Sequence, residues 1–158
     1  MAFALSSIQL TSNAFPAGGQ IPSKHTGEGD NISPALAWDS VPEGTQAFAL
    51  ICHDPDAPLI KQGSYGFVHW VLYNLPADLR SLVEGSTEGT SGVNDYGKNG
   101  YAGPMPPEGH GLHHYYFWIL ALERPLQLPA GLSMAELLEK TEPYLLGVNR
   151  LVGTYQRD

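Results

Sequence analysis

Short runs of aromatic and branched apolar residues dominate the pattern along this chain, and Gly, Pro, Asp or Asn bounds each run. Runs of this length and composition are typical of β-strands. Three of them are almost continuously apolar, which indicates strands that are covered on both faces and therefore central in a sheet. We predict central strands at 46–52, 67–75 and 115–123, with shorter peripheral strands at 8–11 and 151–155.

One clear helix signal follows these strands near the C-terminal end of the chain. Ser133 and Glu136 have the spacing of a capping box, in which each side chain accepts a hydrogen bond from the other residue's backbone N–H. Pro143 should kink or end this helix because it lacks an N–H group. The apolar face of the predicted helix consists of Leu137, Leu138, Tyr144 and Leu145.

Two long segments without a strand or helix signal lie at 16–36 and 84–111. Loops longer than about 15 residues in a compact domain usually build a binding site or are disordered. The second segment alternates Gly with Pro, which favours an ordered backbone with an unusual path. We therefore expect this segment to form the wall of a site.

Composition narrows the class of protein. A chain of 158 residues with 42% hydrophobic and 15% charged residues, and with neither a repeat nor a linker, predicts a single globular domain over 1–158. The 18 Gly and 13 Pro favour turns and β-structure. The net charge of -8, with only eight Lys and Arg, argues against nucleic acid as a partner.

Location follows from the cysteine content and from the apolar runs. The single cysteine excludes an intramolecular disulfide, so we expect a reducing, cytoplasmic compartment. The first ten residues carry no Lys or Arg and no long apolar block, so no secretory signal is expected. The longest apolar run, 115–122, is far shorter than the ~20 residues that span a bilayer, so we expect a protein that is not membrane-spanning.

Asp54 and Asp56 form the most informative short motif, Asp-Pro-Asp-Ala-Pro. A residue before proline is pushed into an extended backbone, and in an extended chain positions i and i+2 point the same way. The two carboxylates should therefore lie side by side at the end of the 46–52 strand. The alternative is a polar turn in which Asp simply favours the turn, and the sequence leaves both open.

His69 lies inside an apolar strand, where a buried imidazole without a hydrogen-bond partner costs about 1–3 kcal/mol. An Asp delivered to the same end of the sheet would be the obvious partner and would orient the ring. The alternative is a core histidine that bonds the backbone or a nearby hydroxyl group.

Three further histidines lie close together before the 115–123 strand. His113 and Tyr115 are two residues apart and should share a face of the strand, whereas His114 should point to the other face. Zinc is the alternative that such a cluster raises, but the spacing is not that of a zinc helix motif. We therefore expect no metal and no cofactor, with His110 and His114 as solvated side chains.

Covalent catalysis finds no support in the sequence. Cys52 and His53 are neighbours on a strand and face opposite sides, and no Gly-x-Ser-x-Gly motif is present. We expect a protein that is not an enzyme.

Several blocks of the sequence, in order and spacing, together resemble the phosphatidylethanolamine-binding protein family, specifically its prokaryotic Raf kinase inhibitor-like branch. These blocks are Asn31–Trp38, Asp54–Pro58, His69–Trp70, Gly103–Pro107, Gly111–Tyr115 and Leu151–Arg157. The resemblance implies a mainly β fold of two β-sheets with a few short flanking helices, and a small anion pocket at one end. By this resemblance the ligand-binding residues are Asp54, Asp56, His69, Pro106, Pro107, His113 and Tyr115. The family often has Arg where this chain has His114, so we expect a rim salt bridge to be lost.

These observations predict a non-catalytic protein that binds a phosphate-type anion or a phospholipid headgroup. Imidazole and phenol groups would donate hydrogen bonds, and the carboxylates would orient the imidazoles. Members of the family are described as lipid, phosphate or nucleotide binders and as kinase or protease inhibitors, so the fold does not settle the role. A protein partner and a homodimer are both compatible with the sequence.

The alternative function is a phosphoester hydrolase that uses the Asp/His cluster as general acid and base. No nucleophile or Mg²⁺ cage is visible for it. For the binding function, we expect the affinity for an oxyanion to rise as the pH falls, because the carboxylates should outweigh burial and favour charged His69 and His113. Replacing His110 should change neither the affinity nor its pH dependence.

Overall fold

The computed structural model describes residues 5–57 and 65–158. Two parts of the predictions lie outside these ranges. One is Pro58, the last residue of the Asp-Pro-Asp-Ala-Pro motif. The other is the first four residues of the N-terminal segment, in which no secretory signal is expected. Within the described ranges, no helix is long and apolar enough to cross a membrane.

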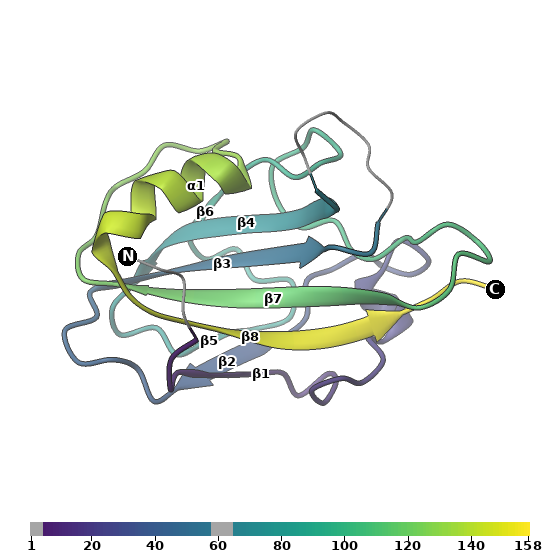
Figure 1. The fold of residues 1–158 in the computed structure, drawn as a ribbon, viewed down its shortest axis with the longest axis horizontal. Helices are drawn as coiled ribbons and strands as arrows, with labels where there is room; N and C mark the ends of the chain where they lie inside the picture. Colours follow the sequence, from purple (N-terminus) through teal and green to yellow (C-terminus); the bar gives the residue numbers. More distant parts are fainter. Residues whose placement is uncertain (1–4, 58–64) are drawn as a thin grey trace.

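Two antiparallel sheets make up the fold (Figure 1). The larger sheet has the order β6-β4-β3-β7-β8, and the smaller has the order β1-β2-β5. The larger sheet consists of β3 (Ala47–Asp54), β4 (Phe67–Pro76), β6 (Thr90–Ser91), β7 (His113–Leu122) and β8 (Leu145–Tyr155). The smaller consists of β1 (Gln9–Thr11), β2 (Leu36–Asp39) and β5 (Ser81–Leu82). The helices are α1 (Met134–Thr141) and the 3-10 turns η1 (Ser23–His25) and η2 (Glu142–Tyr144).

The predicted mainly β fold of two sheets is confirmed. The three predicted central strands are β4, β3 and β7, which lie next to one another in that order. The predicted strand at 8–11 is β1, and the one at 151–155 is the second half of the longer β8.

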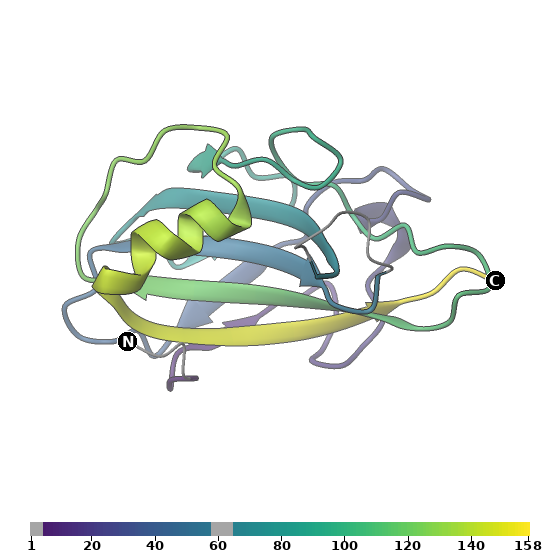
Figure 2. The same cartoon turned by 45° about the horizontal axis from the view of Figure 1, so that its top comes forward.

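The predicted helix is confirmed at its start and corrected at its end. The Ser133 Oγ accepts from the Glu136 N–H at 3.1 Å, and the Glu136 carboxylate accepts from the Ser133 N–H at 3.0 Å. Leu145 is not helical but begins β8, because the chain passes through η2 around Pro143 and then extends. Figure 2 shows α1 lying across one face of the larger sheet.

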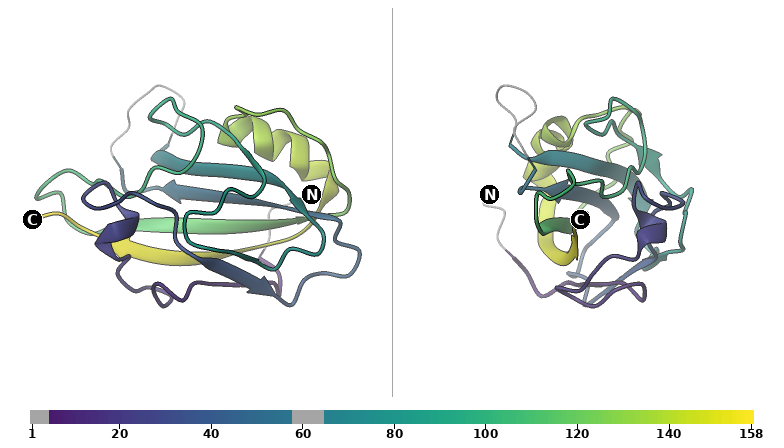
Figure 3. Two further views of the ribbon diagram at one scale, coloured as in Figure 1. Left: turned by 180° about the vertical axis from the view of Figure 1, so that it is seen from behind. Right: turned by 90° about the vertical axis from the view of Figure 1, so that its right-hand side faces the viewer.

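The central strand β3 is buried on both faces, as its continuous apolarity predicts. Phe48, Leu50 and Cys52 face one hydrophobic cluster, which includes residues of the smaller sheet. The alternating residues, among them Ala49 and Ile51, face a second cluster that includes α1. The views in Figure 3 show the N-terminal strands and loops covering the face of the larger sheet opposite α1.

A β-bulge interrupts this alternation in β4. Cys52 pairs with Trp70 and His53 with Val68, so His69 is the extra residue between these pairs. Val68 and Trp70, two positions apart, therefore pack into different clusters. Bulges redirect side chains and are frequent beside functional sites.

Candidate functional site

The end of β3 and the beginnings of β4 and β7 meet at one end of the larger sheet, because β3 lies between the other two strands and runs antiparallel to both. This is the end near the C-terminus in Figure 1. A cavity of about 200 Å³ opens there. Its lining residues are Asp54, Ala57, Phe67, His69, Tyr96, Met105, Pro106, Pro107, His113 and Tyr115. The candidate residues thus meet in space, with the exception of Asp56.

His113 is held between two other polar groups. Its Nδ1 lies 2.6 Å from the Asp54 carboxylate, a contact between residues 59 positions apart in the sequence. Its Nε2 lies 2.6 Å from Nδ1 of His110, so one of these two nitrogens donates to the other. Because Asp54 accepts from Nδ1, the carboxylate orients this ring, as carboxylates commonly do for functional histidines. His110 is exposed, as expected for a solvated side chain, and it also contacts the site directly through His113.

His69 is satisfied by the backbone and not by a carboxylate. Its Nδ1 lies 2.7 Å from the Ala102 carbonyl oxygen, and its own carbonyl accepts from the Ala102 N–H at 3.0 Å. A carbonyl can only accept, so Nδ1 carries the proton and Nε2 is an acceptor in the neutral ring. Burial lowers the pKa of His69 to about 4, although Ala102 and Asp54 act in the opposite direction. The expectation that nearby carboxylates outweigh burial is therefore wrong for this histidine.

Tyr115 contributes a buried hydroxyl group to the cavity. Its side chain is fully buried, and its Oη lies beside the Asp54 carboxylate but makes no well-formed hydrogen bond among the described residues. Burial raises the pKa of this hydroxyl, and the Asp54 carboxylate raises it further, so the group stays protonated and able to donate. A buried polar group without a partner is uncommon and costly, and a ligand oxygen would satisfy it.

The loop that forms the proline wall is fixed by hydrogen bonds from two distant parts of the chain. The Gly103 N–H donates to the Asn31 side chain at 2.7 Å, and a Cβ at Gly103 would lie 2.0 Å from the His25 carbonyl oxygen. Glycine is therefore required where the loop passes His25. Further along, Arg157 donates to the Pro106 carbonyl at 3.3 Å.

Asp56 lies outside the cavity, contrary to the prediction of two carboxylates side by side. The Asp56 N–H donates to the Asp54 carboxylate at 2.7 Å, which closes a turn where the sequence predicted extended backbone. Asp56 bonds His114 Nδ1 at 2.7 Å. Burial would raise the pKa of Asp56, but the hydrogen bonds from His114 outweigh it and lower the pKa. His114 thus hydrogen-bonds the Asp56 carboxylate at the rim, where the loss of a salt bridge was expected.

Four residues that line the cavity were not predicted from the sequence. They are Ala57, Phe67, Tyr96 and Met105. Tyr96 lies in a tight turn that a hydrogen bond from its backbone stabilises. The Tyr96 N–H donates to the Asn94 side chain at 2.9 Å. Its ring packs edge-on against Phe67, with centroids 4.7 Å apart. The sequence did contain a signal for Tyr96. It is an aromatic residue inside an Asn-Asp-Tyr-Gly turn, and this turn lies in the loop that was expected to form the wall of the site.

Charge and volume limit what the cavity can take. Within residues 5–57 and 65–158, no Lys or Arg lines it. Its volume is below the ~300–1,000 Å³ of sites for drug-sized ligands, so a group of phosphate or headgroup size is the natural limit. Among residues 5–57 and 65–158, no group of three or more His, Cys, Asp and Glu side chains could hold a metal ion.

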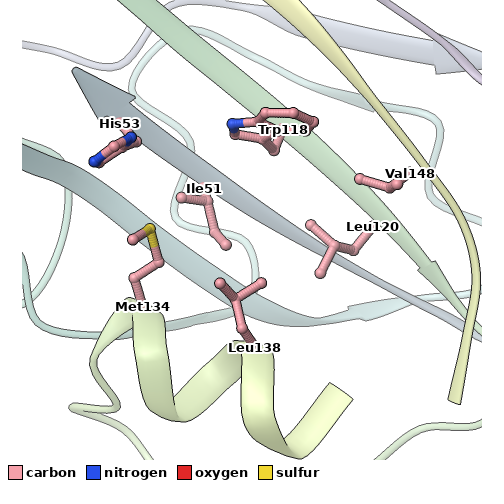
Figure 4. Close-up of a pocket in the computed structure, with 7 residues that line it drawn as sticks. All are labelled: Ile51, His53, Trp118, Leu120, Met134, Leu138 and Val148. Atoms are coloured by element: carbon pink, nitrogen blue, oxygen red, sulfur yellow. The ribbon is translucent and has the colours of Figure 1, made fainter. Parts of the chain in front are cut away.

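A second cavity of about 240 Å³ lies between α1 and the larger sheet (Figure 4). Met134 and Leu138 approach it from the helix, and Ile51 and Trp118 approach it from the strands (Figure 4). His53 is its one titratable lining residue, and its Nε2 bonds the Tyr65 carbonyl at 2.7 Å. Without converging polar groups, this cavity offers no chemistry comparable to the cluster around His113.

Comparison with known proteins shows the family of this chain. The family model for phosphatidylethanolamine-binding protein matches residues 11–156. The chain belongs to the phosphatidylethanolamine-binding protein family. A UPF0098 protein from Methanothermobacter thermautotrophicus is 41% identical over 157 residues, which covers 95% of this chain and 99% of that protein.

Solved structures of this family have the same fold. A putative phosphatidylethanolamine-binding protein homologue, CT736 from Chlamydia trachomatis, has a TM-score of 0.89 and 36% identity, over 96% of this chain and 98% of that one. YbcL from Escherichia coli has a TM-score of 0.87 and 32% identity, over 97% and 100% of the two chains. Both likenesses extend over nearly the whole chain.

Proposed function

We propose that this member of the phosphatidylethanolamine-binding protein family is a non-catalytic binding protein whose cavity between His69 and His113 takes a small phosphate-type oxyanion. The observation that carries the proposal is the Tyr115 hydroxyl, which is buried beside Asp54 and makes no well-formed hydrogen bond among the described residues. A phosphoryl oxygen in the cavity would accept from it. The ligand-binding residues are Asp54, His69, Pro106, Pro107, His113 and Tyr115, with Asp56 as a support that closes the turn after Asp54.

The contacts around the cavity support binding by positioned groups. Asp54 fixes the ring of His113, and Ala102 fixes the ring of His69, so neither imidazole has to be ordered when the ligand enters. Preorganised groups reduce the entropic cost of binding. The same chemistry would accept a phosphomonoester on a segment of a regulated protein.

The alternative, a phosphoester hydrolase, has one observation in its favour. The hydrogen-bonded chain Asp54–His113–His110 resembles the arrangement that activates a nucleophile in acid–base catalysis. The available nucleophiles do not suit it, because burial raises the pKa of both the Cys52 thiol and the Tyr115 hydroxyl. We expect no turnover of p-nitrophenyl phosphate, and turnover that His113→Gln abolishes would favour the hydrolase.

Titration calorimetry with inorganic phosphate tests the binding proposal. Tyr115→Phe removes one hydroxyl group, and a hydrogen bond to a charged group is worth about 1.5–3 kcal/mol, so phosphate affinity should fall roughly tenfold or more. Tyr116→Phe is the matched control, because Tyr116 is the next residue of β7 and stacks on Trp118 away from the cavity. Equal affinity of wild type and Tyr115→Phe, or no phosphate binding at all, would contradict the proposal.

A further inference from the structure

The described lining of the cavity presents hydrogen-bond acceptors as well as donors. The Nδ1 proton of His69 is held by the Ala102 carbonyl, so Nε2 of the neutral ring offers a lone pair. The Asp54 carboxylate is a second acceptor, and it already receives the protons of His113 and of the Asp56 backbone. The hydroxyl donors of the described lining are those of Tyr115, which is buried beside Asp54, and of Tyr96, which is half-exposed.

A fully ionised anion fits these groups poorly. It would place lone pairs against the lone pair of His69 Nε2, and its charge would lie near Asp54, with no Lys or Arg among the lining residues that the structure describes. A buried acceptor that faces another acceptor is left without a hydrogen bond, and its lost hydration then costs free energy that nothing offsets. Among the described residues, the titratable groups near His69 are His53 and Asp54 on β3, Asp95 and Tyr96 on the loop after β6, and His113 and Tyr115 on β7, with His110 bonded to His113.

We infer that the cavity selects an oxyanion that carries its own proton, such as the monoanion of a phosphomonoester, over an oxyanion without one. The P–OH group donates to His69 Nε2, while a phosphoryl oxygen accepts from Tyr115. Burial keeps His69 neutral at physiological pH, which maintains the acceptor. This inference rests on the proposed function and specifies the ligand class: proton-bearing phosphoryl groups bind, and sulfate esters and phosphodiesters are discriminated against.

Three probes of similar size separate these ligands. At about pH 5, phenyl phosphate is mainly a monoanion with a P–OH group, since the second pKa of a phosphate ester is about 6. Phenyl sulfate has the same charge and shape but no proton. Methyl phenyl phosphate is a monoanionic diester, also without a proton, and represents the chemistry of a lipid headgroup. Protonation of other groups in the cavity affects the three monoanions alike.

Calorimetric titration of the wild-type protein at about pH 5 and pH 8 is the test. At the lower pH, phenyl phosphate should bind about tenfold or more tightly than phenyl sulfate, because one buried hydrogen bond is gained and an unpaired acceptor is avoided. Methyl phenyl phosphate should bind like phenyl sulfate. At the higher pH, phenyl phosphate is almost entirely a dianion and has to take up a proton before it can bind as the monoanion. The ratio of phenyl phosphate to phenyl sulfate affinity should therefore fall about a hundredfold.

Two variants assign the effect to its residue. His69→Phe removes the acceptor, so the ratio of affinities at low pH should approach one. His114→Gln replaces an exposed histidine that bonds Asp56 outside the cavity, and it should keep the wild-type ratio. Should His69→Phe fail to fold, nitrogen-15 NMR of the wild type should find His69 protonated at Nδ1 alone, and a proton at Nε2 would overturn the inference.

The outcomes separate the inference from the proposed function. If phenyl phosphate and phenyl sulfate bind equally at about pH 5, or if methyl phenyl phosphate binds as tightly as phenyl phosphate, the ligand's proton is not recognised, and the inference fails while the proposed function stands. If none of the probes binds, both fail.

Discussion

Lowering the pH should destabilise this protein through His69, the most strongly perturbed histidine in the structure. The unfolded chain takes up a proton at this residue below about pH 6.5. In the folded chain, burial lowers the pKa to about 4, because the charged ring would lose its hydration inside the sheet. Neutral His69 therefore stabilises the folded state above the unfolded pKa, and this contribution is lost as the pH falls from about 6.5 toward about 4.

The size of the effect follows from the two pKa values. Between about pH 7.5 and about pH 4.5, the proton uptake of the unfolded chain at this site should cost about 2.5 kcal/mol of unfolding free energy. His69→Gln removes the titration, while the Gln amide N–H can still donate to the Ala102 carbonyl. The variant is therefore expected to lose less stability on acidification than the wild type, by about 2.5 kcal/mol.

Urea denaturation at the two pH values measures this difference. Val68→Ala, at the neighbouring position of β4, is the control, because it removes buried apolar surface without a titratable group. Its destabilisation should be the same at both pH values. If wild type and His69→Gln lose equal stability on acidification, the assignment of a neutral, buried His69 is refuted.

Two further predictions concern the parts of the fold that support the site. Ser133→Ala breaks the capping box of α1 and should lower the free energy of unfolding by about 1 kcal/mol. Urea denaturation measures this loss, and an unchanged stability would mean that the cap contributes nothing. Gly103→Ala would place a Cβ 2.0 Å from the His25 carbonyl and should cost about 2 kcal/mol or more, since this loop is fixed to the rest of the chain. Gly109→Ala meets no atom within 4 Å and should cost only the ~1–2 kcal/mol of its left-handed backbone, and equal costs at the two glycines would contradict the close approach at Gly103.

Much of the fold was predictable because burial on both faces leaves a continuous apolar run. β3, β4 and β7 carry such runs, and the capping box located α1. β2 was missed, because its four residues lie at the end of a segment rich in turn residues. β5 and β6 have two residues each and no periodicity to detect. Short strands of this kind are defined by their partners and not by their own sequence.

The candidate site was predictable in its residues but not in its hydrogen bonds. Strand-end positions identified Asp54, His69 and His113, yet the Asp54 carboxylate bonds His113 and not His69. The reason is the bulge at His69, which no local pattern signals and which turns its ring toward Ala102. The contact of His110 with His113 depends on the path of a glycine-rich loop, which sequence periodicity does not describe.

A crystal structure of the protein with phenyl phosphate would show the bound phosphoryl group itself. We expect density for this group between His69 and His113, with one oxygen within hydrogen-bond distance of Tyr115 Oη and another within that distance of His69 Nε2. An empty cavity at saturating phenyl phosphate, or a phosphoryl group bound elsewhere on the molecule, would contradict the proposal.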